Sequence, residues 1–296
     1  MTDITLLTCQ AYYKPDKITP YIQNILDEEQ LLKAALEKQD LTVDITYWDN
    51  SSYSWNETRC ILFRTVWDYF KRLEKFLLWL EEIKGQTKLI NSYDLIKWNI
   101  DKHYLKDLQG EGIQIVPTFF AEKNCVQSLD DISTMNNWSD LVIKPAISAS
   151  AFKTYKILNS DINNKEKLFQ ELLQQRDMLV QPYINTIEEF GEASLMVFNG
   201  NYSHAVLKKA KLGDFRVQDD FGGTVNSYDP TKEEIAFAEK VFQSCKSMPL
   251  YGRIDIVWDE NRKFYLSELE IIEPELWIRK YPKSAERIAE AVKKIL

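Results

Sequence analysis

Histidine is almost absent from the sequence, whose 296 residues include only two, His103 and His204. A Ser-His-Asp hydrolase or a histidine-ligated metal centre would have to use one of them. His103 falls within a helical pattern and His204 within a strand pattern, and the GxSxG turn of many hydrolases does not occur. We therefore expect both histidines to be structural or peripheral.

Cysteine is scarce as well, and its spacing excludes two further classes of protein. The sequence contains no CxxC motif, and its four cysteines lie far apart, at Cys9, Cys60, Cys125 and Cys245. This spacing argues against a zinc site and against a disulfide framework. It suits reduced thiols in a cytoplasmic protein.

Long apolar runs are missing too. No stretch of about 18 apolar residues occurs, which argues against a membrane-spanning helix. The first residues, MTDITLLTCQ, lack the basic region and the long apolar stretch of a signal peptide. The net charge of −8 argues against nucleic acid as the main partner. We expect a globular protein with neither a nucleic-acid nor a membrane partner.

The sequence does contain the alternating pattern of an α/β protein. Strands are predicted near residues 4–9, 41–48 and 60–63, and helices over 20–38 and 69–83. This alternation favours a mostly parallel sheet that binds ligands at the carboxyl ends of its strands. Arg64 and Asp68 follow one such strand, which makes them candidates for holding a small zwitterionic substrate. A plain Arg64–Asp68 pair that caps the next helix is the alternative.

The rest of the chain mixes helices with strands of an antiparallel type. Asn199-Gly200 indicates a hairpin, and Thr231-x-x-Glu234 is a capping box that opens a helix. The further predicted elements are a helix over 93–110, a strand beginning at 113–117, strands at 141–144 and 178–182 around a helix at 165–176, hairpin strands at 192–198 and 202–208, and a last helix at 284–295.

The most informative segment is a second hairpin, YGRIDIVW followed by KFYLSELEII. If the turn is Glu260-Asn261, Arg253 lies opposite Glu268, and Asp255 lies opposite Leu266. Asp255, Glu268 and Glu270 then share a strand face with Arg253, and three carboxylates on one face predict a site for a hard cation such as Mg²⁺. The alternatives are solvated carboxylates and a simple Arg253–Glu268 salt bridge, and a turn longer by one residue would turn these side chains to the other face.

Positive charge that could bind phosphate occurs on four separate elements. The candidates are Lys102, Lys144, Lys208, Lys211 and Arg216. Lys144 ends an apolar strand and precedes a proline, so we expect it to be half-buried. The small residues at 147–151 follow it and could cover phosphates with backbone amides.

In their order, these motifs resemble the ATP-grasp superfamily, and within it the glutathione-synthetase-like ligases that include D-alanine–D-alanine ligase and the D-cycloserine-forming ligases. The resemblance covers residues 91–276. The motifs are WNIDKHYL around Lys102, VIKP at Lys144, GEASL at 191–195, GDFRVQ at 213–218, GRIDIVW, and ELEIIEP at 268–274.

The resemblance implies a role for each matching residue. Lys102 and Lys144 would hold the α- and β-phosphates of ATP, with Lys208 as a further cationic contact. Gln181, Tyr183 and Ile184 would border the adenine, and Glu192 would bind the ribose. Asp255, Glu268 and Glu270 would bind Mg²⁺ or Mn²⁺, and Arg216 and Arg253 would neutralise the transferred phosphoryl group. Three departures stand out: Glu270 replaces a frequent Asn, Gln181 replaces a frequent Glu, and 147–151 lacks glycines.

The implied fold is an ATP-grasp fold, α/β (α+β) in class, behind an N-terminal α/β pre-ATP-grasp domain. We place the substrate domain at 1–92, the small lid subdomain at 93–184 and the catalytic subdomain at 185–296. The implied activity is an ATP-dependent, ADP-forming ligation of a small carboxylate, activated as an acyl phosphate, to an amine. A cyclo-ligase, a small-molecule kinase and a catalytically idle nucleotide-binding partner are the alternatives, and a homodimer is one assembly to test.

Overall fold

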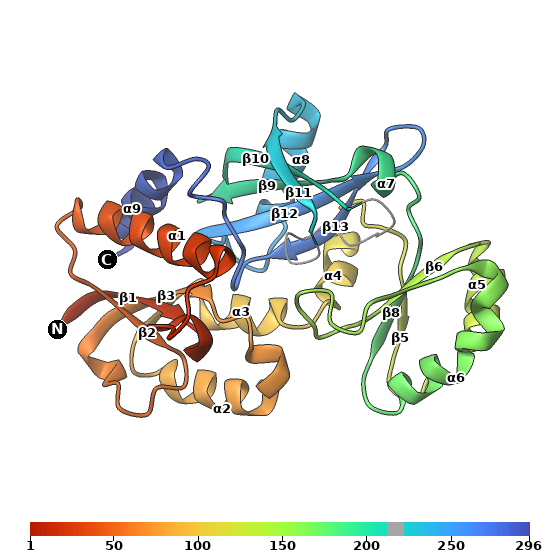
Figure 1. Ribbon diagram of the computed structural model, residues 1–296, viewed down its shortest axis with the longest axis horizontal. Helices are drawn as coiled ribbons and strands as arrows, with labels where there is room; N and C mark the ends of the chain where they lie inside the picture. Colours follow the sequence, from red (N-terminus) through yellow and green to blue (C-terminus); the bar gives the residue numbers. More distant parts are fainter. Residues whose placement is uncertain (212–221) are drawn as a thin grey trace.

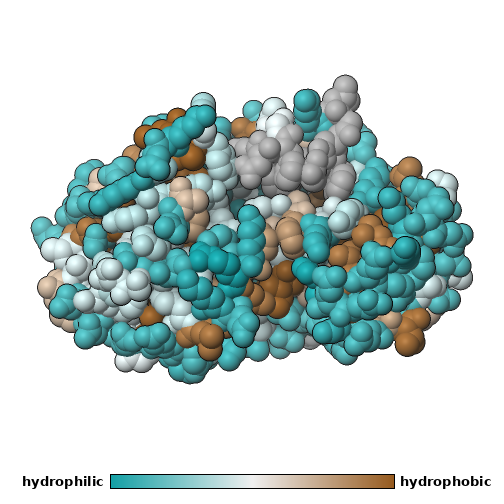
Figure 2. All heavy atoms as spheres, turned by 60° about the horizontal axis from the view of Figure 1, so that its bottom comes forward, coloured by the Kyte–Doolittle hydropathy of each residue, from teal (hydrophilic) through white to brown (hydrophobic). Residues whose placement is uncertain are grey.

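The computed structural model describes residues 1–211 and 222–296, which form three sheets with helices packed around them. Figure 1 shows a broad body that contains two of the sheets and a smaller lobe that contains the third. On the face shown in Figure 2 the surface is mostly hydrophilic, and apolar residues gather in the waist between body and lobe. Within the described ranges, no helix is both long and apolar enough to cross a membrane.

The N-terminal sheet is parallel, with strand order β2-β1-β3-β4. Alternate residues of β1 point to opposite faces, so Ile4 and Leu6 enter the core beneath α1 and α9, whereas Leu7 enters the core on the side of α2. Helices α1 and α9 lie side by side although they come from opposite ends of the chain (Figure 1). The elements are β1 (Thr2–Thr8), α1 (Pro20–Glu37), β2 (Val43–Tyr47), β3 (Thr58–Thr65), α2 (Leu73–Ile83), β4 (Lys88–Ile90) and α9 (Lys283–Ile295), with short 3-10 helices at Gln10–Tyr12, Trp55–Glu57 and Tyr69–Arg72.

The smaller lobe is an antiparallel sheet, β5-β8-β6-β7, covered by two helices. Its core is apolar and includes Ile143, Phe169 and Val180. The elements are β5 (Phe119–Ala121), α5 (Leu129–Asn136), β6 (Leu141–Pro145), β7 (Tyr155–Ile157), a 3-10 turn (Asn159–Asp161), α6 (Ile162–Leu173) and β8 (Met178–Pro182).

The central sheet has strand order β11-β10-β9-β12-β13, and its two faces differ in character. Leu195, Ile254 and Ile256 lie on the face that packs in the core with α4 and α8. The residues that alternate with these along the strands, such as Glu192 and Asp255, lie on the other face. The elements are α3 (Tyr93–Asn99), α4 (Tyr104–Gly110), α7 (Ile187–Phe190), β9 (Glu192–Phe198), β10 (Asn201–Lys209), β11 (Thr224–Tyr228), α8 (Lys232–Gln243), β12 (Tyr251–Trp258) and β13 (Phe264–Glu270).

The predicted register of the β12–β13 hairpin is wrong, although its shared face is right. Arg253 lies opposite Glu270 rather than Glu268, and Asp255 lies opposite Glu268 rather than Leu266. The turn is longer than predicted, which alone would turn the glutamates away. A bulge between Asp255 and Ile256 adds a second one-residue shift, so the two shifts together restore the face.

Two other predicted elements need correction. The helix predicted over 93–110 is divided into α3 and α4 because the Asp101 carboxylate accepts the backbone N–H of His103 (3.0 Å) and forms a turn. The strand predicted from 113 is a single parallel bridge between Ile115 and Leu266, and the strand itself begins only at β5. The predicted mixed α/β class of the fold is otherwise confirmed.

Two buried asparagines join the N-terminal half of the chain to the ends of β12 and β13. The Asn91 amide donates to the carbonyls of Tyr251 (2.9 Å) and Ile271 (2.7 Å) and accepts the N–H of Leu250 (2.6 Å). Asn99 donates to the Leu269 carbonyl (2.8 Å) and accepts the N–H of Ile271 (3.1 Å). These amides take the place of strand neighbours and fix the β12–β13 hairpin against the segment after β4.

Candidate active site

A cavity of about 230 Å³ lies where the three sheets meet. The polar face of the central sheet lines it from one side, β6 and β8 of the smaller lobe line it from another, and Tyr21 and Trp67 of the N-terminal domain close one end. The cavity therefore includes residues from all three parts of the fold.

On the central sheet, neighbouring strands place basic and acidic side chains in alternation. Lys208 forms ion pairs with Glu192 and with Asp255 (3.2 Å). Arg253 in turn pairs with Asp255 (2.8 Å) and with Glu270 across the hairpin. The Ser194 hydroxyl donates to Asp255 (2.6 Å). The sequence-predicted residues of β9, β10, β12 and β13 thus meet on one surface.

The ionisation of these carboxylates follows from burial and from their neighbours. Burial alone would raise the pKa of Asp255, but Arg253 and Lys208 beside it hold that pKa well below its usual range. Burial raises the pKa of Glu270 to about 7, because Arg253 only partly offsets the lost hydration and the charge of Glu268 adds to the shift.

The segment between α3 and α4 brings Lys102 into the same cavity. Its backbone N–H donates to the Ala146 carbonyl (2.9 Å), and its ammonium donates to the Ser148 carbonyl (2.5 Å). The ammonium also pairs with Glu268 (3.0 Å). Lys102 therefore connects the β12–β13 hairpin to the loop that follows β6.

Lys144 extends from β6 into the cavity, and within the described ranges its ammonium has no hydrogen bond or ion pair. Removal from bulk water lowers the pKa of this lysine, and Glu268 only partly opposes the shift. A positive charge that is partly buried and has no counterion suits a ligand that brings negative charge.

The residues predicted to border the adenine all line the smaller-lobe side of the cavity: Gln181, Tyr183 and Ile184. The Gln181 amide is buried and donates to the Thr118 hydroxyl (2.8 Å). The ring of Tyr183 lies under the Lys156 ammonium, 3.6 Å from the ring centroid.

The structure does not bring Arg64 and Asp68 together, so the alternative of an Arg64–Asp68 pair that caps the next helix is wrong. Arg64 is buried, donates to the Pro274 carbonyl (3.3 Å) and faces Glu28 (3.9 Å). Asp68 accepts the indole N–H of Trp48 (2.8 Å) and pairs with Arg72. Neither residue lines the main cavity, although Arg64 lines a small adjoining one.

Sequence reasoning missed other residues at this end of the cavity, namely Tyr21, Trp67, Glu273, Glu275 and Trp277. Trp67 lies between Arg64 and Asp68 in the sequence, and Glu273 belongs to the ELEIIEP motif. Their positions after strand ends were the available signal. Arg216, predicted to neutralise phosphoryl charge, lies outside the described residues.

The three carboxylates predicted to bind metal offer oxygen donors, which are the ligands that a hard divalent cation takes. Their oxygens are occupied by basic side chains, however, and they do not form a tight group. Within 1–211 and 222–296, the one group of three whose ligand atoms lie within 4.8 Å of one another is Asp101, His103 and Asp177.

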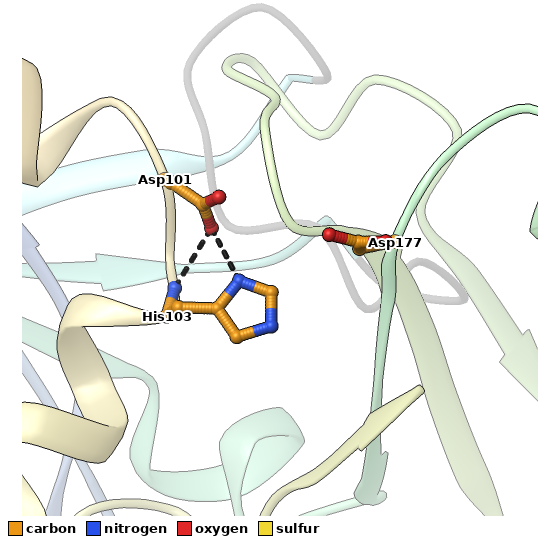
Figure 3. A group of neighbouring side chains, drawn as sticks. All are labelled: Asp101, His103 and Asp177. Carbon is orange, nitrogen blue, oxygen red and sulfur yellow. Dashed lines mark hydrogen bonds and ion pairs between the residues drawn. The ribbon is translucent and has the colours of Figure 1, made fainter. Parts of the chain in front are cut away.

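Figure 3 shows how that group is arranged. The imidazole Nδ1 of His103 lies 2.6 Å from the Asp101 carboxylate, and its ring stacks on Phe120 (5.2 Å between centroids). Asp177 accepts the backbone N–H of Lys123 (2.6 Å). In these contacts the two carboxylates accept hydrogen bonds from neighbouring groups of the chain, which accounts for the positions of the three side chains without a metal ion. His204 is likewise held by the Leu276 carbonyl (2.8 Å), which agrees with a structural role for both histidines.

Comparison with known proteins identifies the family of the chain. The RimK-like ATP-grasp domain matches residues 102–280, so the chain belongs to the RimK-like ATP-grasp family, which uses ATP and a divalent metal ion. Residues 4–91 match the N-terminal domain of the D-cycloserine synthetase DcsG. The chain is 26% identical over 263 residues to the cycloserine biosynthesis protein DcsG of Streptomyces lavendulae. The alignment covers 85% of this chain and 88% of that protein.

Solved structures show the same fold. The crystal structure of D-cycloserine synthetase DcsG superposes with a TM-score of 0.86 at 23% identity and covers 99% of both chains. D-alanine–D-alanine ligase from Bacillus anthracis superposes with a TM-score of 0.67 at 14% identity, over 99% of this chain and 97% of that one. The predicted superfamily is confirmed by the family match over residues 102–280, and these structures show that the fold is shared.

Proposed function

We propose that the protein is an ATP-dependent, ADP-forming ligase that joins a small carboxylate to an amine. The observation that carries this proposal is the composition of one cavity. It combines the acidic and basic surface of the central sheet with the ammonium of Lys144 on the smaller lobe. Phosphoryl transfer depends mainly on alignment and charge neutralisation, which such a surface supplies.

The reaction has two balanced steps. A carboxylate oxygen attacks the γ-phosphorus of ATP, the bond to the β-phosphate oxygen breaks, and an acyl phosphate and ADP form. An amine nitrogen then attacks the acyl carbon, phosphate leaves, and the nitrogen loses a proton. Neither step requires histidine or cysteine as a nucleophile.

We assign the following roles to residues of this chain. Lys102 and Lys144 hold the phosphates, Gln181, Tyr183 and Ile184 border the adenine, and Glu192 binds the ribose. Lys208 orients Glu192 and Asp255, while Arg253 and Arg216 neutralise the transferred phosphoryl group. Arg64 supports the segment of Glu273 and Glu275 through the Pro274 carbonyl, and we assign no direct substrate contact to Asp68. Asp255, Glu268 and Glu270 would hold the divalent ion, proposed to be Mg²⁺ with Mn²⁺ as a substitute, which neutralises phosphate charge when it is bound.

The experiment that tests the proposal is ADP release across a panel of amino acids and dipeptides, offered singly and in pairs. A ligase releases ADP only with a carboxylate substrate and yields an amide. ADP release with a stable phosphorylated product would instead identify a kinase, and ATP binding without any turnover would identify an idle nucleotide-binding partner.

A cyclising ligase is the second candidate. It is favoured by the match of residues 4–91 to the N-terminal domain of a D-cycloserine synthetase. Mass spectrometry separates the two reactions. Cyclisation gives a product lighter than a single substrate by one water molecule, whereas intermolecular ligation requires two substrates.

The remaining assignments concern setting and organisation. We propose a cytoplasmic protein with small-molecule partners, divided at residues 92 and 184 into substrate, lid and catalytic parts. A homodimer is the proposed assembly, and light scattering of the purified chain measures its mass directly.

A further inference from the structure

The charges that line the cavity are almost completely balanced among themselves. Lys102 pairs with Glu268, and Arg253 pairs with Asp255 and Glu270. Lys208 pairs with Glu192, and Glu275 pairs with Arg279 (2.6 Å). Among the described residues of the cavity, two charged side chains remain without a counterion, Lys144 and Glu273. An unbalanced charge in a cavity indicates the charge of the group that the cavity receives.

Glu273 follows β13 and is 6% exposed. Its backbone carbonyl accepts the indole N–H of Trp67 (2.7 Å), which fixes this segment against the N-terminal domain. Its carboxylate faces its own backbone amide but has no hydrogen bond or ion pair with any other residue in the described ranges. Burial, reinforced by the charge of Glu270, raises the pKa of Glu273 to about 8. A cationic ligand would give the Glu273 carboxylate a partner and would lower its raised pKa.

The surroundings of Glu273 favour an organic cation over a metal ion. Tyr21 and Trp67 line the same end of the cavity with ring centroids 6.3 Å apart. Trp277 lines the cavity as well, with the Arg253 guanidinium 5.5 Å from its ring centroid. Aromatic faces attract ammonium groups and pack against carbon. A hard metal ion instead requires several oxygen ligands or bound water.

We infer that the Glu273 carboxylate receives the ammonium group of the substrate, so that the acid activated by this enzyme is an amino acid or a close amino-acid analogue. The inference rests on the proposed ligase function, because the substrate carboxylate must reach the phosphates while its amine reaches Glu273. An acid without the amine leaves Glu273 buried and without a partner, and the enzyme discriminates against it for that reason.

The test traps the acyl phosphate with hydroxylamine, which gives a coloured hydroxamate and needs no second substrate. The probes are D- and L-amino acids, each paired with the 2-hydroxy acid of the same carbon skeleton. We expect wild-type enzyme to prefer the amino member of the active pair by at least about tenfold in kcat/KM. Glu273→Gln should remove most of that preference by raising KM for the amino acid, while the KM for ATP stays within about twofold.

A second variant and two further measurements separate this outcome from damage to the fold. Glu273→Asp keeps the charge and should recover part of the preference. Glu273→Gln replaces a buried carboxyl that has no counterion with an uncharged amide of the same shape, so its melting temperature should equal or exceed that of the wild type. Its affinity for a non-hydrolysable ATP analogue should be unchanged.

The failures of the two proposals are distinguishable. If 2-hydroxy acids form hydroxamate as well as amino acids do, the ligase proposal stands and the role of Glu273 is overturned. If Glu273→Gln changes the Mg²⁺ dependence but leaves the amino preference intact, Glu273 serves the metal and the inference is again wrong. If no acid of the panel supports ADP release, both proposals fail.

Discussion

Replacing Lys144 with methionine should change the ligand-free protein and the ATP complex in opposite directions. The Lys144 ammonium is partly buried in the cavity wall and has no counterion among the described residues, and burial lowers its pKa. The ligand-free fold therefore carries an unfavourable charge that bound phosphate would compensate.

The size of both effects can be stated. Loss of a partly desolvated charge–phosphate contact should raise the dissociation constant of ATP at least about tenfold, or about 1.4 kcal/mol. Removal of the uncompensated charge should stabilise the ligand-free protein by about 1 kcal/mol, which corresponds to about 1–2 °C in melting temperature for a chain of 296 residues. Titration calorimetry measures the first effect and a thermal melt without nucleotide measures the second.

Lys102 offers a matched control within the same cavity. Its ammonium already pairs with Glu268 (3.0 Å) and donates to the Ser148 carbonyl. Lys102→Met should therefore lower the melting temperature of the ligand-free protein, because it leaves both acceptors without a donor. It should also weaken ATP binding. The two lysine variants are expected to agree in ATP affinity and to differ in the sign of the stability change.

Two results would refute this reasoning. Unchanged calorimetric affinity of Lys144→Met for ATP would remove Lys144 from the nucleotide site. A melting temperature that falls by as much as that of Lys102→Met would show that Lys144 supports the ligand-free fold, and the idea of a charge reserved for phosphate would fail.

Three further predictions concern the carboxylates, the arginine and the buried histidine. Glu268→Gln keeps the shape but removes charge, so turnover should fall below about a tenth of the wild-type rate with an unchanged circular dichroism spectrum; a higher rate with the same Mg²⁺ optimum contradicts the assignment. Arg253→Met should spare ATP affinity and lower kcat, because the charge that Arg253 meets develops during phosphoryl transfer; normal kcat with a lower melting temperature would leave only a structural ion pair. Burial lowers the pKa of His204 to about 4, so its contribution to stability is complete above its unfolded pKa of about 6.5 and is lost as pH falls from there toward 4. Over that pH range, the free energy of unfolding of His204→Gln, measured in urea, should therefore fall by about 3 kcal/mol less than that of the wild type. Equal losses would refute the burial of His204 in its neutral form.

The catalytic face was predictable from the sequence because strand alternation fixes which side chains share a side. The register was not. It depends on a turn and on a bulge, each of which shifts the pairing by one residue, and alternation alone cannot count either of them. Ser267 is the residue passed over in the pairing, and it lines the cavity as a result.

Residues that act through long-range packing were harder to predict. Lys102 was placed within one continuous helix, and its position in the cavity depends on the turn made by Asp101. Arg64 was expected to face the substrate, but the aspartate chosen as its partner pairs with Arg72 instead. Glu273 belongs to the ELEIIEP motif, but its lack of a counterion depends on the packing of the surrounding chain, which the motif does not reveal.

The two asparagine contacts to the catalytic hairpin have a consequence for recombination between related enzymes. Asn91 and Asn99 hold the ends of β12 and β13 through side-chain amides, so an exchanged N-terminal domain must leave both amides in position. A chimera joined before Asn91 retains both contacts from this chain. A chimera joined after Asn91 takes the donor's residue at that position, and a donor without asparagine there would leave the backbone groups of Leu250 and Tyr251 without their partner. The crossover point for transplanting substrate selectivity therefore lies at the end of β4.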